Sequence, residues 1–126
     1  MLKRRYGALV LNSEGKVLMR PGSAEGLKNK TWDIPKGLVA EGESPREALI
    51  RGMVERNGII LKEIEFFDTK NEDDTENHIY SAKFDDEMNS RDTIESVDLR
   101  FLSEKEIDNI KIESGTMNLI KKILHG

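Results

Sequence analysis

The stretch that decides the fold is residues 37–59, which read Gly37-Leu-Val-Ala-Glu-Gly-Glu43-Ser-Pro-Arg-Glu47-Ala-Leu-Ile-Arg51-Gly-Met-Val-Glu55-Arg-Asn-Gly58-Ile59. The stretch opens as a glycine-bearing loop and then carries a strong helix-start signal, Ser44-Pro45-Arg46-Glu47. Serine at the N-cap, proline at the first helical position and glutamate two residues later together form a capping box. We therefore expect a helix that begins at Pro45, runs to about Asn57 and is ended by Gly58.

Short strands surround this helix on both sides along the chain. Residues 6–11 and 16–20 read as a hairpin around the turn at 12–15, and residues 32–34 read as a short strand before a loop at 36–42. Three more strands are expected at 59–67, 76–84 and 99–102, followed by a short helix from Ser103 and an amphipathic C-terminal helix. Hairpins mixed with helical connections predict one domain over residues 1–126, an α+β or α/β sandwich with a mixed β-sheet.

Composition narrows the class of protein. The chain has 126 residues, with 20 basic and 24 acidic side chains and a net charge of −4. There is no cysteine, which excludes a disulfide framework, a thiol nucleophile and a zinc-thiolate site. No run approaches the ~18 apolar residues of a membrane span, and no secretory signal is recognisable. We therefore expect a cytoplasmic protein without a membrane partner, and the mild acidity argues against a dedicated duplex nucleic-acid binder.

Residues 37–59 resemble the Nudix box, Gly-x5-Glu-x7-Arg-Glu-U-x-Glu-Glu-x-Gly-U, in which U is a bulky apolar residue. Seven of the nine fixed positions match in register: Gly37, Glu43, Arg51, Met53, Glu55, Gly58 and Ile59. Two positions differ, because Gly52 and Arg56 stand where the pattern has glutamate. The flanking hairpin and residues 95–106 also look like parts of a Nudix domain, so the resemblance spans most of the chain.

The resemblance implies a mixed sheet between helices and hydrolysis of a nucleoside diphosphate linked to another group, with Mg²⁺ or Mn²⁺ as cofactor. It implies catalytic roles for Glu55, Arg51 and Glu43, and metal ligation by Glu55, the Gly37 carbonyl and a carboxylate outside the box, for which Glu95 is the best candidate. Carboxylates one turn apart on a helix suit such a metal, because Mg²⁺ prefers hard oxygen ligands and helps a pyrophosphate undergo attack by water.

Three further residues are candidates for contact with the substrate: Lys36 and Arg56 through phosphate, and Trp32 by stacking. A helical wheel at ~100° per residue places Leu49, Ile50 and Met53 together, and we expect these three to face the core. The opposite face, which a Nudix protein turns to its substrate, would then carry Glu47, Arg51, Gly52, Glu55 and Arg56.

The two departures change the charge of this face by three units toward positive, so we expect weak metal binding and low turnover. The first hypothesis is a Nudix hydrolase of nucleotide pyrophosphates with reduced activity. The segment 32–37 resembles that of hydrolases of diadenosine polyphosphates, RNA 5′ ends and diphosphoinositol polyphosphates, so an RNA 5′ end is the one nucleic-acid substrate we keep. The alternative hypothesis is a non-catalytic Nudix-fold module that binds a nucleotide, another phosphorylated ligand or a protein partner.

Each candidate also has a structural interpretation. Glu47 fits a capping box better than a ligand role, and Glu43 with Arg51 fits an ion pair that holds the loop to the helix. Arg56 is either a surface residue or a phosphate contact, and Trp32 is more often a core residue than a stacking platform. The pattern offers no reason for Gly52. The oligomeric state is left open.

Overall fold

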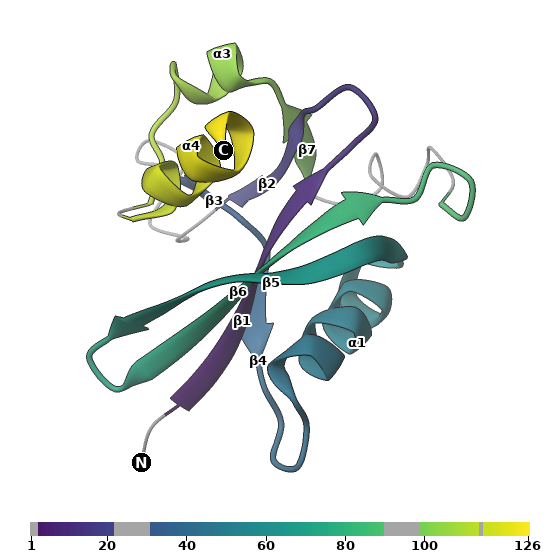
Figure 1. Ribbon diagram of the computed structural model, residues 1–126, viewed down its shortest axis with the longest axis vertical. Helices are drawn as coiled ribbons and strands as arrows, with labels where there is room; N and C mark the ends of the chain where they lie inside the picture. Colours follow the sequence, from purple (N-terminus) through teal and green to yellow (C-terminus); the bar gives the residue numbers. More distant parts are fainter. Residues whose placement is uncertain (1–2, 22–30, 90–98, 114) are drawn as a thin grey trace.

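The computed structural model describes residues 3–21, 31–89, 99–113 and 115–126. One mixed sheet runs in the order β3-β2-β1-β6-β5, with β4 paired to β1 and β7 paired to β2. The elements are β1 (Lys3–Leu11), β2 (Val17–Pro21), β3 (Trp32–Asp33), β4 (Lys36–Leu38), α1 (Pro45–Asn57), β5 (Leu61–Glu72), β6 (Thr75–Phe84), β7 (Arg100–Leu102), α3 (Glu104–Ile107) and α4 (Thr116–His125). Helix α1 lies on one side of the sheet and α3 and α4 lie on the other (Figure 1). The expected α+β sandwich with a mixed sheet is confirmed.

Strand β1 is the centre of the sheet. It pairs in parallel with β6 over its whole length, while its other edge is shared between two strands. The C-terminal end pairs with β2 at Leu11 and Val17, as the predicted hairpin requires. The N-terminal half pairs with β4, where Tyr6 lies opposite Gly37 and Gly7 lies opposite Lys36. The prediction that 36–42 is entirely loop was therefore wrong for residues 36–38, because β1 supplies them with a partner that lies ~30 residues away along the chain.

Alternation along β1 divides the interior into two cores. Tyr6, Ala8 and Val10 pack on the side of α1, together with residues of that helix. Leu9 packs on the opposite side, with residues of α3 and α4. Each strand residue thus belongs to one face of the sheet, as the two-residue period demands.

Helix α1 begins and ends where the sequence predicts. The Ser44 hydroxyl accepts a hydrogen bond from the Glu47 amide, and the Glu47 carboxylate accepts one from the Ser44 amide, both at 3.1 Å. Gly58 ends the helix in the left-handed region with φ of 65°. This φ suits glycine, which has no Cβ to clash there.

The buried face of α1 differs from the predicted one. The buried residues are Ala48, Leu49, Gly52 and Met53, whereas Ile50 is 38% exposed. The prediction that Ile50 faces the core and Gly52 faces outward was therefore wrong. The reason is that Ala48 and Gly52 are small enough to let the helix approach β1 closely, which turns the helix about its axis toward these two residues.

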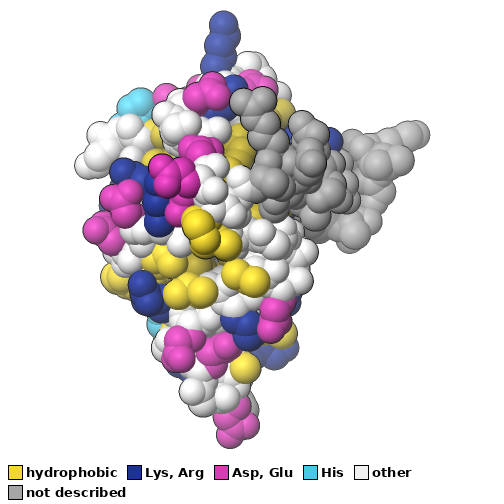
Figure 2. All heavy atoms as spheres, turned by 90° about the vertical axis from the view of Figure 1, so that its right-hand side faces the viewer, with side chains coloured by type: hydrophobic (Ala, Val, Ile, Leu, Met, Phe, Trp, Pro, Cys, Tyr) yellow, Lys and Arg dark blue, Asp and Glu magenta, His cyan; other side chains and the backbone are white. Residues whose placement is uncertain are grey.

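Ile50 lies one turn from Val54 on the outer surface of α1, and both are exposed. In the view from the right-hand side of Figure 1, hydrophobic side chains gather in the middle of the surface, with charged side chains of both signs around them (Figure 2).

In the described part of the chain, no helix is long and apolar enough to cross a membrane.

Candidate functional site

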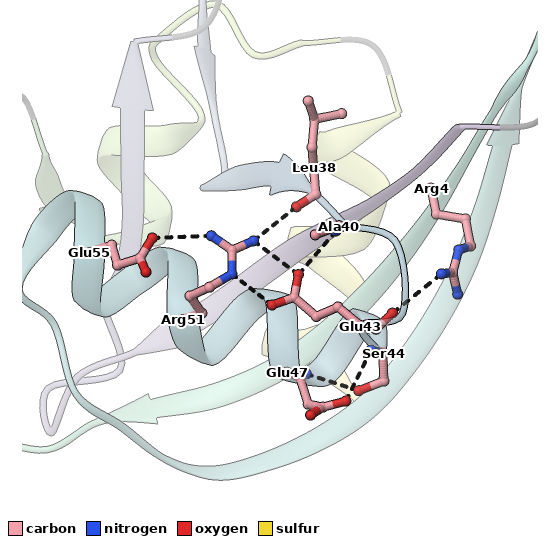
Figure 3. Close-up of polar contacts among 8 residues, drawn as sticks. All are labelled: Arg4, Leu38, Ala40, Glu43, Ser44, Glu47, Arg51 and Glu55. Atoms are coloured by element: carbon pink, nitrogen blue, oxygen red, sulfur yellow. Dashed lines mark hydrogen bonds and ion pairs between the residues drawn. The ribbon is translucent and has the colours of Figure 1, made fainter.

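Arg51 is the centre of the polar network on α1 (Figure 3). Its Nε and Nη2 donate to the two carboxylate oxygens of Glu43 at 2.6 and 3.0 Å, which is a bidentate contact. Its Nη1 donates to Glu55 at 3.2 Å. The Glu43 carboxylate also accepts from the Ala40 amide at 3.0 Å, so it fixes the loop before the helix. The expected ion pair of Glu43 and Arg51 is confirmed.

These contacts set the ionisation of the network. The hydrogen bond from Arg51, and then that from the Ala40 amide, lower the pKa of Glu43 from 4.5 to about 2. The hydrogen bonds that Arg51 donates, first to Glu43 and second to Glu55, raise the pKa of Arg51 above its usual value. Glu43 has 16% of its side chain exposed, against 63% for Glu55. Glu55 is therefore the carboxylate of this network that is open to a ligand.

The position of the Tyr6 ring explains why residue 52 is a glycine. A Cβ atom built on Gly52 would lie 2.1 Å from the Tyr6 hydroxyl oxygen, and one built on Gly37 would lie 2.4 Å from Cε2 of the same ring. The two glycines thus lie against the Tyr6 ring from α1 and from β4. The room that a side chain at position 52 would need is filled by a phenol, which sequence reasoning missed because Tyr6 lies 46 residues before Gly52.

Burial and the charges of several arginines set the ionisation of this phenol. Burial raises the pKa of Tyr6 above its usual value, and the positive charges of Arg56, Arg51, Arg20 and Arg5 act against that shift. The phenol is therefore neutral near pH 7. Burial also lowers the pKa of Arg20, which Arg5 and Arg56 lower further and Asp33 raises. The positive charges of arginines on β1, β2 and α1 thus act on the ionisation of one phenol.

The predicted substrate residues do not all lie together. Arg56 is exposed, and its Nη1 lies 3.5 Å from the backbone carbonyl oxygen of Lys36. The Lys36 side chain belongs to the opposite face of the sheet, where its Nζ lies 3.0 Å from Asp33. Trp32 is half-buried and packs against the core beside α4. The structure therefore brings Arg56 near the backbone of Lys36, and separates it from the Lys36 amine.

A pocket on the α4 side contains Lys36. Its volume is about 120 Å³, and it is open to solvent between β6, the end of β5 and the start of α4. The polar groups that line it include Lys36, Asn77, Thr116 and Asn118. The Thr116 hydroxyl donates to the buried Asp33 at 2.7 Å, so the floor of this pocket is held by the same carboxylate that binds Lys36.

The described residues do not make a divalent-metal site by themselves. No group of three or more histidine, aspartate or glutamate side chains that could hold a metal occurs among them. Of the predicted ligands, Glu55 bonds to Arg51 and Gly37 lies against Tyr6, while Glu95 lies outside the described residues. The predicted metal ligands therefore stay a prediction.

Comparison with known proteins gives the family. The model of the NUDIX domain matches residues 1–122. The chain therefore belongs to the Nudix family. A solved structure of MutT, from work on Aliivibrio salmonicida and Vibrio cholerae, is similar with a TM-score of 0.78 at 19% identity and covers 99% of this chain and 98% of its own.

A second similar structure is the NUDIX domain of Shewanella oneidensis NrtR complexed with ADP ribose, with a TM-score of 0.77 at 17% identity over 99% of this chain and 88% of its own. Among curated proteins, the RNA pyrophosphohydrolase of Cereibacter sphaeroides is 37% identical over 60 residues, which are 48% of this chain and 36% of that protein. The RNA pyrophosphohydrolase of Bartonella quintana is 36% identical over 62 residues, 45% of this chain and again 36% of the relative. The chain thus spans little more than a third of the length of these relatives.

Proposed function

We propose that this Nudix domain binds a nucleotide or a similar phosphorylated ligand beside α1, and that it does so without the metal-dependent hydrolysis of a complete Nudix box. One observation carries the proposal: the Tyr6 hydroxyl fills the space beside Gly52, where the box has a carboxylate. The second replaced position, Arg56, adds a cation on the same side of the helix.

Electrostatics supports this choice over catalysis. Two unit charges 4 Å apart interact by about 4 kcal/mol at an effective dielectric of 20, and a divalent ion doubles this figure. A guanidinium in place of a carboxylate therefore turns an attraction to a metal into a repulsion of similar size. Arginine is, however, well suited to phosphate, because its planar donors form bidentate charge-assisted hydrogen bonds.

The comparisons support the chemical class of the ligand. The NrtR domain is complexed with ADP ribose, and the curated relatives are named for a pyrophosphate bond at RNA. Both ligands carry a phosphorylated nucleotide. For this chain we infer a ligand of that chemical class, and neither ADP ribose nor RNA in particular.

Hydrolysis is the second candidate, favoured by the intact network of Glu43, Arg51 and Glu55. If Glu95 supplies the carboxylate outside the box, Glu55 and Glu95 with the Gly37 carbonyl would be the metal ligands. The expected turnover is then low and depends on Mg²⁺ or Mn²⁺.

One experiment separates the two. The full chain is incubated with a panel of nucleotide pyrophosphates, including ADP-ribose and 5′-triphosphorylated RNA, with Mg²⁺, with Mn²⁺ and with EDTA, while binding of each is measured by calorimetry. Binding without turnover supports the proposal. Metal-dependent turnover that Glu55→Gln abolishes and the matched control Glu65→Gln leaves intact would establish the hydrolase instead, since Glu65 is an exposed residue of β5.

A further inference from the structure

The pocket on the α4 side of the sheet contains a buried amide without a partner. Asn77 lines this pocket and is only 8% exposed, yet its side chain forms no hydrogen bond within the described part of the chain. Buried polar side chains in folded proteins are nearly always hydrogen-bonded, because the contacts with water that they lose have to be replaced. The pocket is the space from which a ligand could supply the partner of this amide.

The strand register places a positive charge on each side of Asn77. Lys70 is its partner on β5, and Arg5 is its partner on β1. Paired residues of neighbouring strands point to the same face of a sheet, so both cations belong to the face that carries α4. Lys70 lines the pocket and forms an ion pair with Asp68 at 3.7 Å, with half of its side chain exposed. The Nε of Arg5 is buried and has no hydrogen-bond partner.

The first turn of α4 forms another wall of the pocket. Gly115 and Thr116 line it, and Gly115 is an N-cap without a side chain that could accept from the helix amides. The first amides of a helix have no partner within the helix and carry a partial positive charge. Because α4 is ten residues long, this end is a full helix N-terminus, of the kind that binds phosphate through backbone N–H groups.

Hydrogen-bond donors prevail over acceptors in the lining. Lys36 adds a second ammonium group, which has three N–H donors and lies 3.0 Å from Asp33. Among the described residues that line the pocket, the one carboxylate is that of Glu72, an exposed residue at the end of β5. The apolar part of the lining comes from the buried residues Ile79 and Leu119. A ligand with negative charge and several acceptor oxygens therefore fits this pocket best.

We infer that this pocket is a separate phosphate site, which binds the phosphate group of inorganic phosphate or of a phosphomonoester among Asn77, Lys70 and the first amides of α4. Its volume of about 120 Å³ compares with about 150 Å³ for a cavity that takes one benzene molecule, so a phosphate group fits and a whole nucleotide does not. The site lies on the face of the sheet opposite α1. It therefore goes beyond the ligand site proposed beside that helix and does not depend on it.

The test is a titration of the full chain with inorganic phosphate and, separately, with adenosine monophosphate, followed by heteronuclear NMR. We expect both to shift the side-chain amide resonances of Asn77 and the backbone amide resonances of Thr116 and Asn118. Equal affinities would identify phosphate itself as the ligand, and tighter binding of adenosine monophosphate would identify a phosphomonoester; either result supports the site. Shifts confined to α1, or no shifts up to millimolar concentrations, would overturn the inference.

Lys70→Gln tests the contribution of the cation. It should raise the dissociation constant for phosphate about tenfold, because a hydrogen bond to a charged group can contribute that factor. Lys62→Gln is the matched control, since Lys62 is an exposed residue of the same strand and does not line the pocket. Equal losses in the two variants would mean that phosphate is attracted by the charge of the strand as a whole, which would overturn the site.

Asn77→Leu separates a ligand contact from a structural one. Leucine is similar in size, and the substitution removes no hydrogen bond within the described part of the chain. The free energy of unfolding in urea without phosphate should therefore not fall, whereas phosphate binding should be lost. A fall in stability would assign the amide to the fold, and unchanged phosphate binding would exclude it from the site; either result would overturn the inference.

Discussion

A methyl group at position 52 would collide with Tyr6, because an ideal Cβ there lies 2.1 Å from the hydroxyl oxygen. Alanine is the better helix former by ~1 kcal/mol, so propensity alone predicts that Gly52→Ala stabilises the protein. Overpacking of a filled interior costs about 1–3 kcal/mol. We expect the collision to prevail, so that urea denaturation shows a lower free energy of unfolding for Gly52→Ala.

The same substitution in a Tyr6→Phe background is the control. Phenylalanine lacks the oxygen that makes the closest contact, so part of the penalty should disappear in a double-mutant cycle. An equal penalty in both backgrounds would show that the Tyr6 hydroxyl is not the atom that excludes a side chain at position 52.

Glu43 gives a prediction about pH. Its pKa is about 2 in the folded protein, against 4.5 for the unperturbed group. A folded-state pKa below the unfolded one means that the stabilisation is complete above about pH 4.5 and is lost as the pH falls toward about 2. Free energies of unfolding for the wild type and Glu43→Gln should therefore differ most near neutral pH and converge in acid. A difference that stays constant from neutral pH to about pH 2 would contradict the ion pair with Arg51.

At the scale of the element, α1 holds Arg51, Glu55 and Arg56 in place, and its start is fixed by Ser44. The hydroxyl accepts from the Glu47 amide, so Ser44→Ala should lower the free energy of unfolding by about 1 kcal/mol. Ser13→Ala, at an exposed turn of the first hairpin, should change it by less than ~0.5 kcal/mol. Equal losses in both variants, measured by urea denaturation, would show that the capping box does not set the stability of the helix.

Contacts between near neighbours in the sequence made the ends of α1 predictable. Features that depend on contacts between distant residues could not be predicted. The ends of α1 follow from Ser44 and Gly58, whose roles depend on near neighbours in sequence. The strand at 36–38 escaped prediction because its partner is the N-terminal half of β1. Ile50 was misplaced because apolar residues alone define no clear stripe on this helix, and because the tight approach at Gly52 depends on a tyrosine in another strand.

The candidate site shows the same division. Glu43 and Arg51 follow from a spacing within one loop and one helix and form the expected ion pair, which Glu55 joins from the next turn. Lys36 was grouped with Arg56 by type of residue, yet the alternation along β4 sends its side chain to the opposite face. Tyr6 carries no spacing signal, since the sheet alone brings it to the helix.

At the scale of the whole molecule, the loss of the two box carboxylates on α1 is linked to a residue of another element, Tyr6 on β1. Restoring both with Gly52→Glu and Arg56→Glu would shift the charge of this face by three units toward negative, but Tyr6 would still occupy the space that a glutamate side chain at position 52 needs. The compensating change therefore lies in β1. We expect the triple variant, with Tyr6→Val added, to gain metal binding that the double variant lacks.

Thermal unfolding with and without Mn²⁺ measures this gain. Saturation to about 100 times the dissociation constant would stabilise the triple variant by about 2.7 kcal/mol, because the metal binds only the folded chain. The wild type and the double variant should shift less, and metal-dependent hydrolysis of pyrophosphates should follow the same order. An equal shift in the double variant would show that Tyr6 is no obstacle. No shift in the triple variant would mean that the metal site also needs groups beyond positions 6, 52 and 56, so that β1 and α1 together are not enough to restore it.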